Sequence, residues 1–124
     1  MKTTDAELEI LQVLWHYGPQ TVRQVHERIH TSKGIGYTTT LKLLQIMYEK
    51  GLVQRDDDQR SHIYRAAVEE QAVKKTLLTR FIEATFQGST GSLVLEALGH
   101  ENLSKEELDR IKALINQLEN PPQS

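Results

Sequence analysis

Hydrophobic residues recur at intervals of three or four positions along most of this 124-residue chain, the spacing that places side chains on one face of an α-helix. The pattern changes after residue 51, where two short β-prone runs, 53–56 and 62–66, flank a polar turn. From residue 68 onward the helical spacing returns. The sequence therefore predicts three helices, a hairpin and a second helical region, which is a mainly α fold with a small β-hairpin wing.

The first two helices are predicted from start signals as well as from apolar spacing. Thr4 and Glu7 are spaced as a capping box, in which each side chain bonds a backbone amide that the helix leaves free. The helix that they open is expected to end at Gly18. Thr21 is the expected N-cap of the second helix, which should close between residues 34 and 36. In the first helix, Leu8, Leu11, Leu14 and Trp15 recur at helical spacing, and Ile10 and Val13 flank them. In the second helix, the expected buried stripe is Val22, Val25 and Ile29.

The third helix is expected to begin at Tyr37 or Thr38 and to have two different faces. Gly51 supplies the left-handed cap position that ends it. Its core face falls at positions i, i+3, i+4 and i+7 and consists of Thr40, Leu43, Leu44 and Met47. Its opposite face is small, polar and basic and consists of Thr38, Leu41, Lys42, Gln45, Ile46 and Glu49.

This order of elements is that of a winged helix-turn-helix, a fold most often used to hold one helix in the major groove of DNA. Threonine hydroxyls can then contact phosphates or base edges, Lys42 can reach guanine or phosphate, and Gln45 can pair with adenine. Leu41 and Ile46 are expected to be exposed and to meet thymine methyl groups. The full predicted DNA-binding set is Tyr37, Thr38, Thr39, Leu41, Lys42, Gln45, Ile46, Arg60 and His62.

Residues 68–124 form the second predicted region, after a winged-helix domain over residues 1–67. Ser104 and Glu107 are spaced as a capping box for the last helix. Two or three helices of this size cannot bury their apolar stripes within one chain, since a region below about 70 residues is marginal alone. We therefore expect a homodimer formed by the following tail residues: Leu77, Phe81, Leu93, Leu95, Leu108, Ile111, Leu114, Ile115 and Leu118.

The composition is that of a globular protein, with 38% hydrophobic and 26% charged residues, but the charge is unevenly distributed. A formal net charge of −2 argues weakly against nucleic-acid binding, because a phosphate-facing surface is usually basic. However, basic residues outnumber acidic ones between Thr21 and Arg55, and the acidic excess follows Ala66. A basic head over residues 21–55 and an acidic tail indicate two separate tasks.

Several classes of protein do not fit this composition. No apolar run approaches the roughly 20 residues of a membrane span, and the N-terminal residues lack the apolar stretch of a signal peptide. The absence of cysteine excludes disulfides, thiolate catalysis and cysteine metal sites. We expect a cytoplasmic protein with no cofactor and no membrane contact of its own.

One motif suggests an enzyme instead. His26-Glu27-Arg28-Ile29-His30 matches the zinc-peptidase pattern, in which two imidazoles one turn apart bind zinc and the glutamate acts as general base. Against this, the helix is short, no sheet precedes it to hold a peptide, and the third histidine of the extended pattern would fall at Gly36. A small zinc peptidase is kept as an alternative, while the expectation is no catalytic and no metal site.

Several segments together resemble the BlaI/MecI/CopY family of bacterial repressors. The resemblance is carried by residues 6–10, 14–15, 21–25, 37–39, 48–53, 60–64, 91–95 and 103–108. It implies a winged-helix domain and a helical dimerisation region, with dimers that bind inverted-repeat operators. It further implies repression of genes for β-lactam resistance or, in one branch, copper transport. In the β-lactam branch, a membrane-bound sensor metallopeptidase triggers cleavage of the repressor within its tail.

Residue by residue, Thr38, Thr39 and Lys42 match family positions that contact DNA. Leu41 stands where some members have a base-contacting arginine, so the operator sequence does not carry over. The Asn-Phe cleavage site of the β-lactam repressors corresponds here to Glu96-Ala97, and the cysteines that bind copper are absent. The predicted function is a homodimeric repressor on a palindromic operator, with recognition helices about 34 Å apart. A winged-helix adaptor that binds only proteins is the other alternative.

Overall fold

The computed structural model describes residues 3–29, 34–57 and 62–122. The chain divides into two compact units, Met1–Thr76 and Leu77–Ser124. This division falls inside a helix, so the domain boundary expected after residue 67 stays a prediction.

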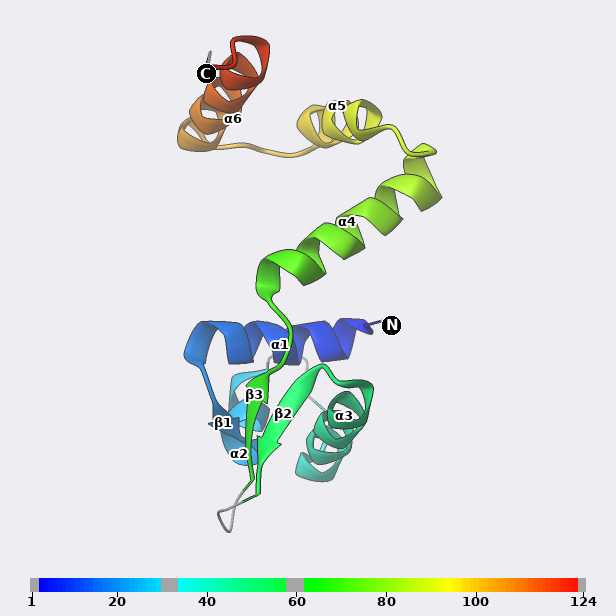
Figure 1. Cartoon of the computed structure of the whole chain (residues 1–124), viewed down its shortest axis with the longest axis vertical. Helices are drawn as coiled ribbons and strands as arrows, with labels where there is room; N and C mark the ends of the chain where they lie inside the picture. The colour runs from blue at the N-terminus through cyan, green and yellow to red at the C-terminus, as the bar shows by residue number, and fades with distance from the viewer. Residues whose placement is uncertain (1–2, 30–33, 58–61, 123–124) are drawn as a thin grey trace. The chain divides into compact units, whose positions relative to one another are not determined.

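Helices and a small sheet make up the first unit. Its elements are α1 (Asp5–Tyr17), β1 (Gln20–Thr21), α2 (Val22–Arg28), α3 (Tyr37–Lys50), β2 (Val53–Asp56) and β3 (Ile63–Ala66) (Figure 1). The three helices and the hairpin confirm the predicted winged helix-turn-helix order. One helix is shorter than expected, because Ile29 leaves α2 in an extended conformation with φ −84° and ψ 128°. Its side chain is nevertheless buried, as predicted.

The sheet contains a strand that the sequence pattern did not predict. β3 lies between β1 and β2 and pairs antiparallel with both, with Gln20 opposite Tyr64 and Val53 opposite Ala66. β1 is two residues long and consists of glutamine and threonine, so it carries no alternation of apolar and polar side chains. Its pairing fixes the start of α2 against the hairpin.

The predicted N-caps of α1 and α2 and the predicted end of α3 are confirmed. In the α1 capping box, the Glu7 amide donates to Thr4 Oγ1 at 3.2 Å and the Thr4 amide donates to Glu7 Oε1 at 2.9 Å. Thr21 caps α2 through the corresponding pair with Gln24. Gly51 ends α3 in the left-handed conformation, with φ 81° and ψ 13°. That conformation favours glycine, and it lets the chain turn from α3 into β2.

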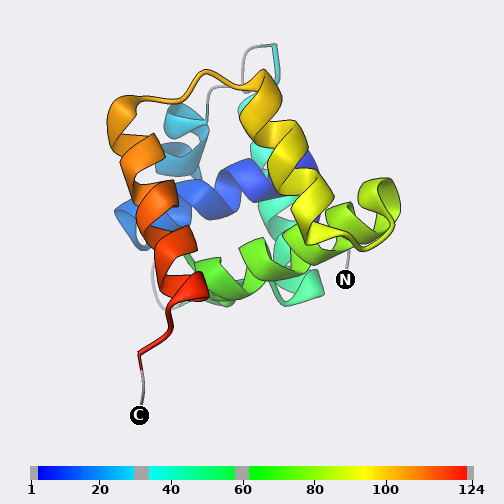
Figure 2. The same cartoon turned by 90° about the horizontal axis from the view of Figure 1, so that it is seen from above.

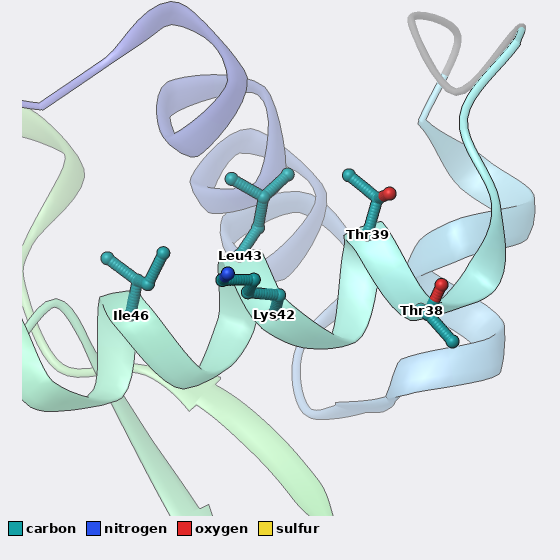
Figure 3. Close-up of a pocket in the computed structure, with 5 residues that line it drawn as sticks. All are labelled: Thr38, Thr39, Lys42, Leu43 and Ile46. Carbon is teal, nitrogen blue, oxygen red and sulfur yellow. The ribbon is translucent and has the colours of Figure 1, made fainter.

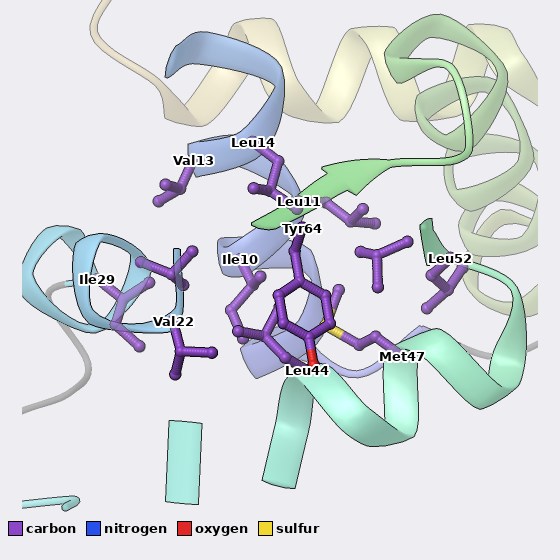
Figure 4. Close-up of a cluster of buried hydrophobic side chains, with 12 residues drawn as sticks. Ile10, Leu11, Val13, Leu14, Val22, Ile29, Leu44, Met47, Leu52 and Tyr64 are labelled. Carbon is purple, nitrogen blue, oxygen red and sulfur yellow. The ribbon is translucent and has the colours of Figure 1, made fainter. Parts of the chain in front are cut away.

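A single hydrophobic core joins the elements of the first unit (Figure 4). Tyr64 of β3 is fully buried among side chains of all three helices. The core consists of Ile10, Leu11, Val13, Leu14, Val22, Val25, Ile29, Leu44, Met47, Leu52, Val53 and Tyr64. The buried face of α1 is shifted toward the predicted flanking residues: Ile10 and Val13 are buried, whereas Leu8 and Trp15 are half-buried.

The remaining helices are α4 (Glu70–Phe86), α5 (Thr90–His100) and α6 (Lys105–Glu119). Ser89 caps α5, and Ser104 forms the predicted capping box with Glu107 at the start of α6. In the described part of α5 and α6 no side chain is buried. The two helices are joined by residues 101–104, which cross from the end of one to the start of the other (Figure 2). None of the described helices has the length and apolarity needed to cross a membrane.

Candidate nucleic-acid interface

The first turn of α3 presents polar groups to solvent. Its N-cap is Gly36, which has no side chain to bond the first amides, so the positive end of the helix dipole stays open to an anion. Tyr37, Thr38 and Thr39 are all exposed in this turn. Backbone amides and hydroxyls in this arrangement are suited to phosphate oxygens.

Further along α3, the outward face forms a shallow groove. It is lined by Thr38, Thr39, Lys42, Leu43 and Ile46, whose side chains follow one side of the helix (Figure 3). Lys42 and Gln45 are exposed, and Ile46 is half-buried. Basic, hydroxyl and methyl groups side by side can pair with base edges and thymine methyls.

Two leucines of α3 differ from their expected positions. Leu41, expected to be exposed, is half-buried and packs on the core. Leu43, expected inside, is also half-buried, packs on the core and lines the outer groove. The fully buried side chains Thr40, Leu44 and Met47 define a narrow strip, and both leucines lie at its edges. The role of Leu41 in DNA contact stays a prediction.

The start of α3 is held against α2 by a polar contact. His26 Nδ1 lies 2.6 Å from Thr40 Oγ1, and Thr40 is fully buried. The His26 ring also meets the Tyr37 ring edge to face, with 6.1 Å between centroids. These contacts fix the mutual orientation of the two helices of the helix-turn-helix.

The end of α3 is held against α1. The ammonium of Lys50 pairs with the carboxylate of Glu7. Glu7 is almost fully buried. α3 is therefore anchored to a different helix at each end, and the face between the anchors is held in a fixed direction.

A cation stacks beside the first turn of α3. The guanidinium of Arg23, on α2, lies 5.3 Å from the centre of the Tyr37 ring. Arg23 is exposed, so its charge faces solvent next to the open helix start. Arg23 is not among the residues predicted to contact DNA, because it lies on another helix and no spacing rule links it to Tyr37.

The hairpin carries a small charged cluster. Asp57 accepts a hydrogen bond from Arg55 Nε at 2.7 Å and lies 2.8 Å from Nδ1 of His62. Arg55 in turn stacks on Tyr48 of α3, with 4.2 Å to the ring centre. His62, predicted to touch the DNA backbone, is thus engaged with an acidic neighbour. Arg60, the other predicted wing contact, lies outside the described residues.

The zinc-peptidase alternative gains no support from this geometry. Nδ1 of His26 is engaged by Thr40, and His30 lies outside the described residues. Within residues 3–29, 34–57 and 62–122, no group of three potential metal-binding side chains comes together.

The predicted dimerisation residues form no core within one chain. Leu77, Leu93 and Ile111 are half-buried, while Leu95 is 75% and Leu118 72% exposed. The other exposed large apolar side chains on α4, α5 and α6 are Leu78, Phe81, Val94, Leu98, Leu108, Leu114 and Ile115.

Comparison with known proteins gives one consistent result. A sequence model of the family described as penicillinase repressor matches residues 3–117. The methicillin resistance regulatory protein MecI of Staphylococcus aureus (strain N315) is 27% identical over 113 residues, covering 91% of this chain and 92% of that protein. The transcriptional regulator BlaI of Mycobacterium tuberculosis (strain H37Rv) is 29% identical over 117 residues, covering 93% and 83%.

Among solved structures, a MarR family transcriptional regulator from Silicibacter pomeroyi is similar to this chain. The TM-score is 0.45 at 18% sequence identity, over 90% of this chain and 66% of that one. This chain therefore spans slightly less than two thirds of that protein.

Proposed function

The chain belongs to the penicillinase repressor family, whose members are transcriptional repressors and not enzymes, and from that premise we propose that it binds an inverted-repeat DNA operator as a homodimer. Each protomer would place α3 in one half-site and its hairpin over the adjoining backbone. Because a bacterial repressor meets its DNA in the cytoplasm, we also propose that the protein is cytoplasmic.

One observation carries the proposal: α3 is anchored at both ends while its polar face is left open. Thr38, Thr39, Lys42 and Gln45 are exposed on it. A helix of 14 residues is about 21 Å long, and the major groove, about 12 Å wide, admits a helix. A net charge of −2 does not conflict with this, since the acidic excess lies after Ala66, where nine acidic residues face six basic ones.

The homodimer is supported by the uncovered apolar side chains of α4, α5 and α6. A monomeric protein rarely leaves so many large apolar side chains exposed together, because water contact with them is unfavourable. Occupation by a second copy would bury them and would supply the second α3 that an inverted repeat requires.

Relief of repression by a membrane-bound sensor metallopeptidase belongs to the proposal through the family resemblance. At the bond that corresponds to the family cleavage site, Glu96 and Ala97 are exposed but lie inside α5. Glu96 Oε2 is also 2.6 Å from His100 Nε2, one helical turn later. A protease would have to unwind α5 there, and neither residue matches the Asn-Phe pair, so we expect cleavage at a different bond.

The test is selection of binding sites from random duplex DNA, followed by fluorescence anisotropy titrations at several salt concentrations. We expect Lys42→Ala to weaken binding and to reduce the slope of log affinity against log salt by about 0.9, if Lys42 neutralises one phosphate. Lys112→Ala is the matched control, since Lys112 is exposed on α6. Failure of the wild-type chain to select any duplex would overturn the proposal, and unchanged binding by Lys42→Ala would overturn the assigned face.

A further inference from the structure

Ala67 and Val68, between the hairpin and α4, are each held by contacts with the rest of the first unit. The Ala67 amide donates to the Leu52 carbonyl at 2.9 Å. The Val68 side chain packs on the core, and the Val68 carbonyl accepts a hydrogen bond from Trp15 Nε1 at 2.9 Å. The chain is therefore held in place through Val68.

α4 begins almost immediately after this hydrogen bond. Its first residue is Glu70, and the Val73 amide already donates to the Glu69 carbonyl at 3.1 Å. Only Glu69 separates the carbonyl held by Trp15 from the helix. The direction of the Val68 carbonyl thus constrains the direction in which α4 starts.

The hydrogen bond matters because the surface beside it is hollow. Gln12, Trp15 and His16 of α1 line a cavity together with Glu70 and Lys74 of α4. Lys74 Nζ lies 2.7 Å from Glu70 Oε2, so these two charges of α4 pair with each other. Because this cavity separates α1 from the start of α4, side chains do not pack closely there. The hydrogen bond from the half-buried Trp15 to the Val68 carbonyl therefore holds the start of α4 in place of such packing.

We propose that Trp15 is a positioning residue that sets the direction in which α4 leaves the winged-helix unit and thereby the half-site spacing that the dimer accepts. This inference rests on the proposed function. α4 has 17 residues and is about 25 Å long, so a tilt of about 10° at its base moves its far end by roughly 4 Å. One base pair rises about 3.4 Å, so such a tilt corresponds to about one base pair of spacing.

The chain permits an unusually specific variant. Trp15 is its only tryptophan, so biosynthetic replacement of tryptophan by 3-benzothienylalanine changes this position alone. The analogue keeps the shape of the indole and lacks the N–H donor. Trp15→Phe is the genetic counterpart, and Val13→Ala, a buried position on the same helix, is the control for loss of packing without loss of the bond.

The first measurement tests the direction of α4 without DNA. The chain has no cysteine, so Ala6→Cys on α1 and Glu83→Cys on α4 accept spin labels at two exposed positions. Labelled chains diluted with unlabelled ones give distances within one chain. We expect a single distance distribution for the wild type and Val13→Ala, and a broader one for the analogue and Trp15→Phe. An unchanged width for the analogue would overturn the inference.

The second measurement uses the DNA selected by the wild-type chain, with the two half-sites moved apart or together by one and two base pairs. In the analogue, we expect the ratio of affinities for the best spacing and for the altered spacings to fall about fivefold, the change in an equilibrium constant that corresponds to one typical hydrogen bond. In Val13→Ala, we expect this ratio to be unchanged. An unchanged preference in the analogue would overturn the spacing claim and leave the repressor standing. If the wild type bound no duplex, the proposed function and the spacing claim would both fail, while the spin-label widths would still decide whether Trp15 directs α4.

Discussion

Lys50 Nζ lies 2.8 Å from Oε1 and 2.9 Å from Oε2 of Glu7, and this pair joins the last turn of α3 to the first turn of α1. Glu7 is 1% exposed, and its Oε1 also accepts the Thr4 amide. One carboxylate therefore closes the capping box of α1 and fixes the end of α3.

The first prediction is a loss of stability in acid that depends on Glu7. Burial raises the pKa of Glu7, but the hydrogen bonds from Lys50 and Thr4 outweigh burial, so its pKa lies below the ordinary value of 4.5. The unfolded chain then binds the proton more tightly. The stabilisation is present above pH 4.5 and is lost as the pH falls through the lower folded pKa.

Urea unfolding at a series of pH values from neutral to acidic measures this effect. Glu7→Gln should be less stable than wild type by about 1.5–3 kcal/mol near neutral pH, as for a hydrogen bond to a charged group, and the difference should shrink in acid. Lys50→Met should also reduce the acid dependence, because Glu7 then loses its cation. Parallel curves for wild type and Glu7→Gln would show that Glu7 does not contribute to the acid transition.

The second prediction concerns the bond between His26 and Thr40. Thr40→Val keeps the shape of the side chain and removes the hydroxyl, so we expect a loss of about 1 kcal/mol in the free energy of unfolding. The measurement is thermal unfolding followed by circular dichroism. Thr39→Val is the matched control, since Thr39 is adjacent and exposed, and it should leave stability unchanged.

The same experiment separates this role of His26 from zinc binding. A ligand that binds the folded state raises its stability by mass action, so zinc should leave the unfolding temperature of the wild type unchanged. A zinc-dependent rise that disappears in a His26→Ala variant would contradict the structural role proposed here.

The third prediction is that Ile111→Asp together with Ile115→Asp converts the proposed dimer to monomers. Ile111 is half-buried and Ile115 is 46% exposed on α6, and charge in an apolar interface costs several kcal/mol. Ala113→Asp with Gln117→Asp adds the same charges at the same spacing on exposed positions outside the apolar stripe, and it should stay dimeric. Sedimentation at several protein concentrations distinguishes the two. Dimers of the first variant would show that α6 does not form the interface.

Local signals predicted much of the fold. The Thr4–Glu7 and Ser104–Glu107 boxes and the glycine at position 51 gave helix ends that the structure confirms. These signals are short-range, since a cap depends on residues within one turn. Val53–Asp56 was likewise predicted with the bounds that it has.

Long-range relationships were not predictable in the same way. β1 forms only because β3 passes beside Gln20 and Thr21, and two polar residues give no periodic pattern. Glu7 was predicted as a cap, but its burial depends on Lys50, 43 positions later. The bond between Trp15 and Val68 spans 53 positions. At the candidate site, the outward direction of Thr38 and Lys42 followed from spacing, whereas the stacking of Arg23 on Tyr37 required the packing of α2 on α3.

The absence of buried side chains in the described part of α5 and α6 affects how repression depends on the number of copies of the protein. Since neither buries a side chain by itself, their ordering and the pairing of two copies are expected to be one event, and its extent depends on the number of copies present. Operator occupancy would then rise faster than in proportion to copy number. A decline in synthesis would likewise lower the occupancy of the proposed operator more than in proportion.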